Sequence, residues 1–210
     1  GSNWVRAQSL YPTDPRQLLP ANGDLQEINP SSPTLPNYWG FTGVNGSTSV
    51  ITSYPISTIS HIKTGGSLDS AYVGGLLGAG VGSGTSLSGL HTATLFPYNQ
   101  RKTYDLTGWI LLPVNILNGA TFDVLVDLLA YNNPNGTGTP NVYHHVLRYT
   151  NSSGGTVVAG TWVPSDITTF VPNVAGTYAR LVFMAMYNSA GTNLNGTTWG
   201  LDDILLDPKA

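Results

Sequence analysis

The sequence predicts an all-β protein folded as a two-sheet antiparallel β-sandwich of the jelly-roll type. The first reason is composition: charged residues make up 9% of the chain, with Glu27 as the single glutamate, against an average of about 25%. Glutamate and lysine favour helices, whereas the abundant threonine, valine and tyrosine favour strands, and glycine, asparagine and proline favour turns. The second reason is that short apolar runs alternate with turn residues along most of the chain.

The N-terminal part of the chain differs from the rest. Residues 1–36 contain six prolines and show no regular apolar pattern, so we expect them to be irregular. We expect residues 1–15 to form a linker or a strap across the domain surface, with Gly1 and Ser2 as a cloning scar. Residues 16–210 then form one domain, because a chain of this length buries enough surface to be stable without a second core.

Strand-like runs follow in order along the rest of the chain. We expect strands near residues 48–53, 58–63, 68–77, 86–96, 103–113, 121–132, 142–150, 156–163, 166–171, 178–188 and 198–206. Loops rich in glycine and asparagine separate them, as at 132–141 and 188–198. Because no helical pattern intervenes, the strands are expected to form two packed antiparallel sheets.

Four of these runs alternate with a period of two residues, which gives each strand two distinct faces. In residues 103–113, Tyr104, Leu106 and Ile110 share one face, and Trp109 lies on the other. The runs at 121–132, 142–150 and 178–188 also carry apolar or aromatic side chains on both faces. A face that only meets solvent does not need them, so one face is expected to pack in the core and the other to line a ligand groove.

Composition and motifs exclude several functions. The absence of cysteine excludes disulfide bonds and thiolate chemistry. A net charge of −3 with scattered cations is not the basic surface that nucleic-acid binding needs, and no apolar run is long enough for membrane insertion. The adjacent His144 and His145 point to opposite faces of a strand and cannot chelate one ion together.

Catalysis is not expected either. A glycosidase normally needs two carboxylates that flank the scissile bond. Asp123 and Asp127, the aspartates best placed to face a groove, lie four residues apart on one strand, or about 13 Å, beyond the spacing of about 5–9.5 Å that the two mechanisms use. No nucleophile elbow, metalloprotease motif or phosphate-binding loop is present. We therefore expect a non-catalytic protein that binds a neutral polar ligand.

Three stretches follow one another in an informative order. They are QLLPANGDLQEINPSSPTLPNYWGFTG at 17–43, TATLFPYNQRKTYDLTGWI at 92–110, and the segment from GTWVPSDITTFVPNVAGTYARLVFMA to WGLDDILLDP at 160–208. Together they resemble the jelly-roll carbohydrate-binding modules of families four, nine and twenty-two, over residues 16–208. The resemblance implies a glycan-binding β-sandwich in which Trp39, Trp162 and Trp199 are core residues.

Asp202 and Asp203 stand side by side inside the last predicted strand, where aspartate is unfavourable and costly to bury unpaired. The resemblance implies that an aspartate here joins a glutamate of the N-terminal segment around a structural calcium ion, which takes about 6–8 oxygen ligands. Gln26 stands where that glutamate is expected, and Glu27 follows it. The predicted ligands are therefore Gln26, Glu27, Asp202 and Asp203. The alternative is an edge-strand aspartate pair satisfied by backbone N–H groups and water.

The resemblance also implies where a glycan binds. Trp109 lies opposite the core face of its strand, on the sheet surface that forms the concave cleft in such modules. Predicted for the same face are Tyr131, Tyr143, His145, Asp127 and Arg180. Sugar C–H groups stack on aromatic rings, and charged groups make oriented hydrogen bonds to hydroxyls. The alternative for each residue, equally weighted, is that it packs beneath a loop.

We therefore expect a module that binds a cell-wall or surface polysaccharide and belongs to a larger multidomain protein or a virion assembly. The scarcity of lysine and glutamate, with abundant Gly, Asn, Thr and Ser, favours a bacteriophage tail protein of the distal-tail or baseplate kind. Its location would be the virion or the cell exterior. The alternatives are an accessory module of a secreted glycanase, a jelly-roll glycanase or lyase, and a structural or protein-interaction domain of a virion.

Overall fold

The computed structural model describes residues 19–25, 27–43, 71–75, 88–186 and 197–209, and every helix or strand assigned in these ranges is a β-strand. The strands are β1 (Ile28–Asn29), β2 (Ser32–Pro36), β3 (Trp39–Gly43), β4 (Tyr72–Gly75), β5 (Ser88–Thr92), β6 (Phe96–Pro97), β7 (Tyr104–Leu111), β8 (Thr121–Tyr131), β9 (Asn141–Thr150), β10 (Trp162–Pro164), β11 (Thr168–Phe170), β12 (Tyr178–Met186) and β13 (Thr198–Pro208). Within the described ranges, no helix has the length and hydropathy of a membrane span.

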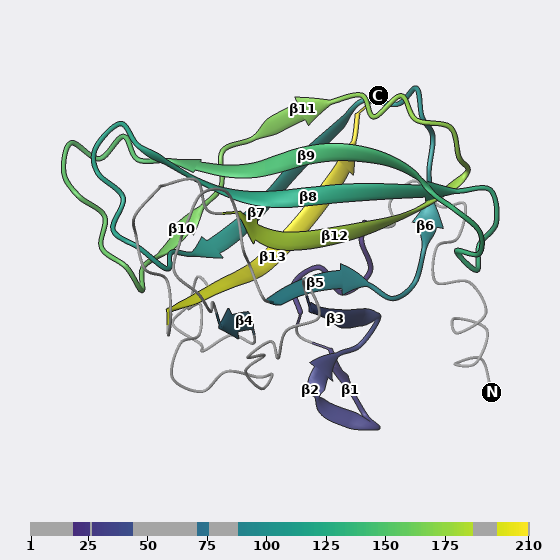
Figure 1. The fold of residues 1–210 in the computed structure, drawn as a ribbon, viewed down its shortest axis with the longest axis horizontal. Helices are drawn as coiled ribbons and strands as arrows, with labels where there is room; N and C mark the ends of the chain where they lie inside the picture. The colour runs from purple at the N-terminus through teal and green to yellow at the C-terminus, as the bar shows by residue number, and fades with distance from the viewer. Residues whose placement is uncertain (1–18, 26, 44–70, 76–87, 187–196, 210) are drawn as a thin grey trace.

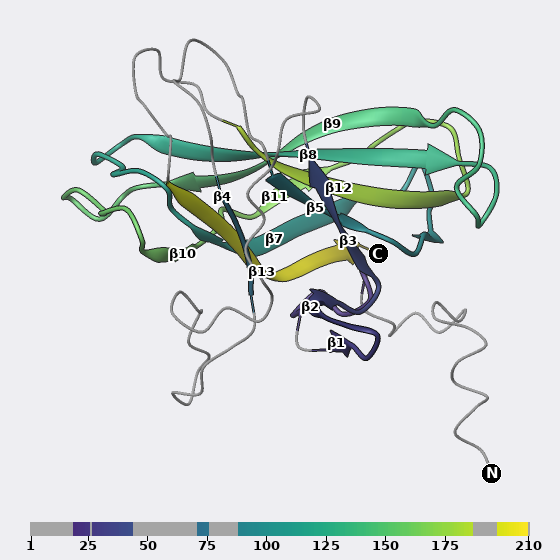
Figure 2. The same ribbon diagram turned by 60° about the horizontal axis from the view of Figure 1, so that its bottom comes forward.

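Two antiparallel sheets pack against each other as a β-sandwich (Figure 1). The six-stranded sheet has the order β3-β5-β12-β8-β9, with β6 also paired to β12. The five-stranded sheet has the order β10-β7-β13-β4, with β11 also paired to β7. Figure 2 shows β8, β9 and β12 in one layer and β7 and β13 in the other, with the β1–β2 ribbon outside both. The predicted fold class is confirmed.

The core between the sheets follows the two-residue alternation of the strands. Leu106 and Ile110 of β7 face Val126 of β8 and Phe183 of β12 within one cluster of buried side chains. Burying an apolar side chain of this size stabilises the fold by roughly 1.5–3 kcal/mol. The alternation predicted for β7, β8 and β12 is therefore the one that the fold uses.

The tryptophans divide differently from the prediction. Trp39 and Trp199 are buried as expected, and the indole N–H of Trp39 donates to the carbonyl oxygens of residues 21 and 22 at 3.1 and 3.0 Å. The prediction for Trp162 was wrong: its side chain is only partly buried and lies outside the core cluster. It lies on the outer side of the five-stranded sheet, where a Cβ added to Gly200 would be 2.9 Å from the indole ring.

Several predicted segments also differ in detail. The predicted strands at 48–53 and 58–63 lie outside the described residues, and the run at 86–96 is divided between β5 and β6. The expectation of an irregular N-terminal segment was wrong for β1 and β2. The Asn22 side chain donates to the carbonyl oxygens of Glu27 and Asn37 and accepts from the Glu27 N–H, all at 2.9 Å. One polar side chain ties both ends of the ribbon, so no apolar periodicity is needed to order it.

Candidate functional site

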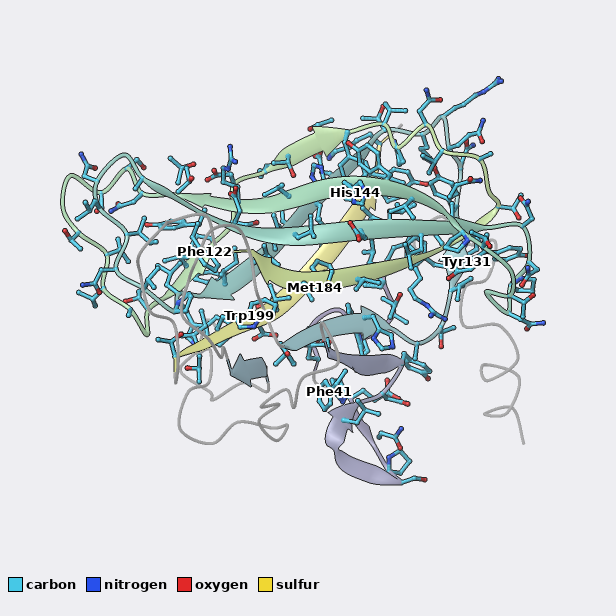
Figure 3. All side chains as sticks on the ribbon, viewed as in Figure 1. Phe41, Phe122, Tyr131, His144, Met184 and Trp199 are labelled. Carbon is cyan, nitrogen blue, oxygen red and sulfur yellow. The ribbon has the colours of Figure 1, made fainter. Side chains whose placement is uncertain are left out.

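The outer face of the six-stranded sheet carries a row of polar side chains on neighbouring strands. Asp127 of β8 is in register with His144 of β9 on one side and with Val182 of β12 on the other. Residues in register on adjacent strands point to the same side of a sheet, so these three lie together on the face away from the core. Figure 3 labels His144 and Met184 on this face.

Two side-chain pairs, each with one aspartate, join β8 to β9 on this face. Nδ1 of His144 lies 2.6 Å from Oδ1 of Asp127, with 72% of the histidine side chain and 18% of the aspartate side chain exposed. Arg148 donates from Nε and Nη2 to the two oxygens of Asp123 at 2.7 and 2.8 Å. This fork-shaped contact raises the pKa of Arg148, because the hydrogen bonds to Asp123 favour its charged form. The Asp127–His144 pair is the one that solvent and ligands reach.

Arg180 of β12 lies on the same face, in register with Leu129 of β8. A Cβ added to Gly136 would be 3.4 Å from Nη2 of Arg180, so the loop between β8 and β9 reaches the guanidinium group. In the part of the chain that the structure describes, the buried Nε of Arg180 has no hydrogen-bond partner. A buried donor without a partner is costly, so Arg180 is held on this face against an energetic cost.

His91 of β5 extends this polar row toward β3. It is in register with Val182 on one side and with Gly40 on the other, where a Cβ would be 2.5 Å from its Nε2. Glycine at position 40 therefore leaves the space that the imidazole ring occupies. Burial lowers the pKa of His91, and the positive charge of Arg180 lowers it further. The ring is therefore neutral at pH 7, a state in which it can both donate and accept hydrogen bonds.

Partly exposed aliphatic side chains separate the polar groups on this face. They are Leu125 and Leu129 of β8 and Val182 and Met184 of β12. Oriented polar groups beside apolar patches are the arrangement that binding sites for neutral polar ligands share. Of the six predicted site residues, Asp127 and Arg180 lie here.

Tyr131 is at the end of β8, in register with Tyr178 of β12, and is labelled in Figure 3. Only 8% of it is exposed. The structure places it at the end of this face with little ring surface available to a ligand. This is the alternative of a packed tyrosine that the sequence left open.

Tyr143 and His145 lie on the opposite face of β9, so the prediction that they share a face with Asp127 was wrong. Their rings pack against Phe170 of β11, with centroid distances of 5.3 and 4.2 Å. Nε2 of His145 is 2.7 Å from the hydroxyl of Thr168, and burial lowers the pKa of His145. The two rings therefore connect β9 to β11 across the edge of the sandwich.

The prediction missed His144 and Arg148 as residues of this face, although their spacing in the sequence matches that of Asp123 and Asp127. Asp123 and Asp127 are four residues apart on one strand, and His144 and Arg148 are four apart on the next. When two such strands pair antiparallel, one register brings the two aspartates opposite the histidine and the arginine, and this is the register observed.

Trp109 lies on the other sheet, so the prediction that it shares a face with Asp127 and Arg180 was also wrong. It is partly exposed on β7, in register with Pro164 of β10 and Asp202 of β13. The partly buried Trp162 is in register with Leu111, two residues from Trp109 on β7. The outer face of the five-stranded sheet thus carries two tryptophans, and its role in binding stays a prediction.

The two aspartates of β13 have different surroundings because a β-bulge separates them. Asp202 is fully buried and accepts a hydrogen bond from the N–H of Asp203 at 2.8 Å. Asp203 has a φ of 48°, and the register of β13 against β7 shifts between Asp202 and Leu205. Asparagine and aspartate tolerate such left-handed conformations, so the backbone geometry of the bulge explains why an aspartate stands at position 203.

Asp203 lines a cavity of about 490 Å³ between the N-terminal segment and β13, together with Asp24 and Glu27. Within the described ranges, no three His, Asp or Glu side chains are close enough to hold a metal ion. Gln26, the remaining predicted ligand, lies outside the described residues. Glu27 already accepts a hydrogen bond from the side chain of Asn37 at 2.8 Å. Because calcium also takes backbone carbonyl and water oxygens, the site stays a prediction.

The comparisons with known proteins define the fold. No family model and no curated protein matches this chain. A solved structure described as "CBM4 structure and function" superposes with a TM-score of 0.50 at 16% identity, over 90% of this chain and 98% of that one. The fold matches that of a family-four carbohydrate-binding module. An arabinose-bound α-L-arabinofuranosidase superposes with a TM-score of 0.50 at 13% identity, over 89% of this chain and 26% of that one. At such low identity these likenesses establish the fold alone.

Proposed function

We propose that this protein is a non-catalytic carbohydrate-binding module that binds a cell-wall or surface polysaccharide on the outer face of its six-stranded sheet. The observation that carries the proposal is the exposed Asp127–His144 pair, with Arg180 two residues from Val182 on the adjoining strand. A carboxylate and a guanidinium group in fixed positions can each bind two neighbouring hydroxyls, while Leu129 and Met184 contact sugar C–H groups. The fold shared with a carbohydrate-binding module supports the same function.

The aspartates of this face are better suited to hydrogen bonding than to acid–base catalysis. Asp123 is nearly buried and held by both arms of Arg148, and Asp127 is paired with His144. The two lie four residues apart on β8, or about 13 Å, beyond the carboxylate spacing of about 5–9.5 Å that glycosidases use. We therefore propose binding without turnover.

Titration calorimetry against a panel of cell-wall and plant polysaccharides tests the proposal, with three variants compared to the wild type. Asp127→Ala and Arg180→Ala are each expected to weaken binding by about 10- to 100-fold, the effect of losing hydrogen bonds to a charged group. Trp109→Ala, on the other sheet, is the matched control and is expected to bind within about threefold of the wild type.

The opposite result has a clear meaning. If Trp109→Ala loses binding and Asp127→Ala keeps it, the ligand binds on the five-stranded sheet and the assignment of the face is wrong. If no polysaccharide binds, a structural domain of a virion becomes the better assignment.

We further propose that the module belongs to a phage tail and attaches it to the host cell wall, on the basis of its composition. Retention of the fluorescently labelled protein on bacterial cell walls, lost with Asp127→Ala, would support this setting. An accessory module of a secreted glycanase is the second candidate, because the arabinofuranosidase contains this fold in about a quarter of its chain. That setting instead predicts retention on plant polysaccharide.

A further inference from the structure

The strand β9 forms an edge of the six-stranded sheet and is ten residues long. The other strands at the edges of the two sheets, β3, β4, β6, β10 and β11, have between two and five residues in the described part of the chain. A long edge strand offers a row of backbone donors and acceptors to another strand, and proteins usually protect it with lysine, proline or a covering segment. β9 contains neither lysine nor proline. The segment that includes Asp166 and Thr168 meets the end of this edge at Arg148 and the inner-face ring of His145, and in the described part of the chain no backbone group of it pairs with Val142, His144 or Val146.

The hydrogen bonds around β9 show which of its residues point outward. The carbonyl oxygen of Arg148 accepts from the N–H of Asp166 at 2.7 Å, so it points away from β8. In an antiparallel ladder the N–H and C=O of one residue point to the same side, and alternate residues share that side. The backbone groups of Val142, His144 and Val146 therefore point outward as well. In the described part of the chain, they have no backbone partner on that side.

We propose that this edge binds β9 of a second copy of the chain, antiparallel, about a two-fold axis at His144. Such an axis places His144 beside His144 of the second copy, and Val142 beside Val146 of the second copy. All of these are residues whose backbone groups point outward, so the hydrogen-bonding groups match without a shift. An axis that paired outward with inward residues would leave them unmatched.

The side chains of β9 are also self-complementary in this register. On the outer face, Val142 meets Val146, a pair of β-branched residues that favours adjacent strands. On the inner face, Tyr143 meets His145 of the second copy, repeating the stacked contact that these rings make within one copy, with centroids 6.0 Å apart. The two His144 rings face each other at the axis, and each keeps its contact with its own Asp127. This match to itself is the reason for choosing a second copy over an unrelated peptide.

The consequence for binding rests on the proposed function, whereas the pairing itself does not. Two copies joined at β9 would form one continuous sheet, with the Asp127 and Arg180 groups of both copies on the same outer face. A polysaccharide chain that crosses the axis would contact both copies, and linked sites can exceed the affinity of one by about 10²- to 10⁴-fold.

Analytical ultracentrifugation of the protein without sugar, from about 10 μM to 1 mM, tests the pairing. The wild type is expected to dimerise with rising concentration. V142K/V146K places lysine opposite lysine across the axis and should remain monomeric over this range. V142K/V146E places lysine opposite glutamate in the same register and should restore the dimer.

Val146→Pro provides a test of the backbone contribution. It removes an N–H that points outward and is not part of the β8 ladder, and proline is tolerated on edge strands for this reason. It should melt near the wild-type temperature and fail to dimerise. A wild type that stays monomeric at 1 mM, or a V142K/V146K variant that dimerises normally, would overturn the pairing. Because sugar is absent, either result leaves the proposed carbohydrate binding to its own experiment.

Discussion

The outer faces of the two sheets accommodate aspartates inside strands in different ways. Both carry aspartates inside strands, where a carboxylate is costly to bury. On the six-stranded sheet, Asp123 is paired with Arg148 and Asp127 with His144, both on β9. On the five-stranded sheet, Asp202 is fully buried beside Trp109, and a bulge at Asp203 redirects the chain. The first face presents paired polar side chains in a regular register, and the second presents aromatic rings beside an irregular strand.

The difference shows that the role of a polar residue in a strand cannot be inferred until its neighbours across the sheet are known. In the six-stranded sheet the cross-strand register supplies the partners, so the face stays polar and regular. In the five-stranded sheet the backbone of β13 departs from regular strand geometry at the bulge. The close packing around this strand leaves little room for an added methyl group.

The largest expected effect tests that packing. Gly200→Ala should lower the free energy of unfolding by about 2–3 kcal/mol, as overpacking of a tight site usually does. The added Cβ would lie 2.6 Å from the carbonyl oxygen of Tyr72 and 2.9 Å from the Trp162 ring. Gly108→Ala on β7 is the matched control, because its Cβ would meet no atom closer than 3.3 Å. Urea unfolding of both variants measures the difference, and equal stabilities would contradict the tight contact.

The predicted calcium site lies beside the same irregular strand. If the ion binds, chelation with EDTA should lower the melting temperature by several degrees, because a ligand that binds only the folded state stabilises it. The cavity lined by Asp24, Glu27 and Asp203 is the place where it would act. Asp203→Asn should then melt at the same temperature with and without calcium. Identical melting of the wild type in EDTA and in calcium would exclude a structural ion.

A smaller effect is expected on the six-stranded face. Arg148→Met would leave the nearly buried carboxylate of Asp123 without its cation and should cost about 1–3 kcal/mol, toward the lower value because Arg148 is half-exposed. The double variant D123N/R148M should recover part of the loss, because no uncompensated charge remains. Chemical denaturation of the single and double variants measures this, and equal losses would show that the charge is unimportant.

The smallest effect concerns the boundary between the two sheets. Burial lowers the pKa of His145 from its ordinary 6.5, so the unfolded chain takes up a proton before the folded protein does. Stability is therefore retained above about pH 6.5 and falls as the pH drops from there toward the lower pKa of the folded state. His145→Phe keeps a ring against Phe170 and should show a smaller acid-induced fall in melting temperature, with His91 still contributing. An unchanged pH profile would show that His145 is not responsible.

Much of the fold could be predicted from the residues alone because the relevant signal is local. The alternation of Leu106, Ile110, Val124, Val126 and Phe183 assigns these side chains to the core, and the structure buries each of them. The same alternation places Asp127 and Arg180 outside the core. The ribbon of β1 and β2 was missed because the side chain of Asn22 orders it, and an apolar periodicity does not indicate such a contact.

The candidate site was predicted less well because it depends on pairing between distant strands. Trp109 and Asp127 both lie opposite the core face of their strands, yet they are in different sheets. Tyr143 and His145 look as suitable as His144 and Arg148, and a shift of one residue exchanges them. The matched spacing of the two aspartates with His144 and Arg148 was present in the sequence, and it indicates the correct register only once β8 and β9 are known to be neighbours.

The sequence by itself determined that the chain forms strands and which residues of most strands face inward, and it predicts a neutral polar ligand. These properties depend on the composition and on a period of two residues, both of which are local. Only the tertiary structure decided which strands share a sheet, which outer face carries which charges, and that Asp202 and Asp203 separate at a bulge. Those properties depend on contacts between residues far apart in the chain, where the free energy of packing selects one register among several that are locally equivalent.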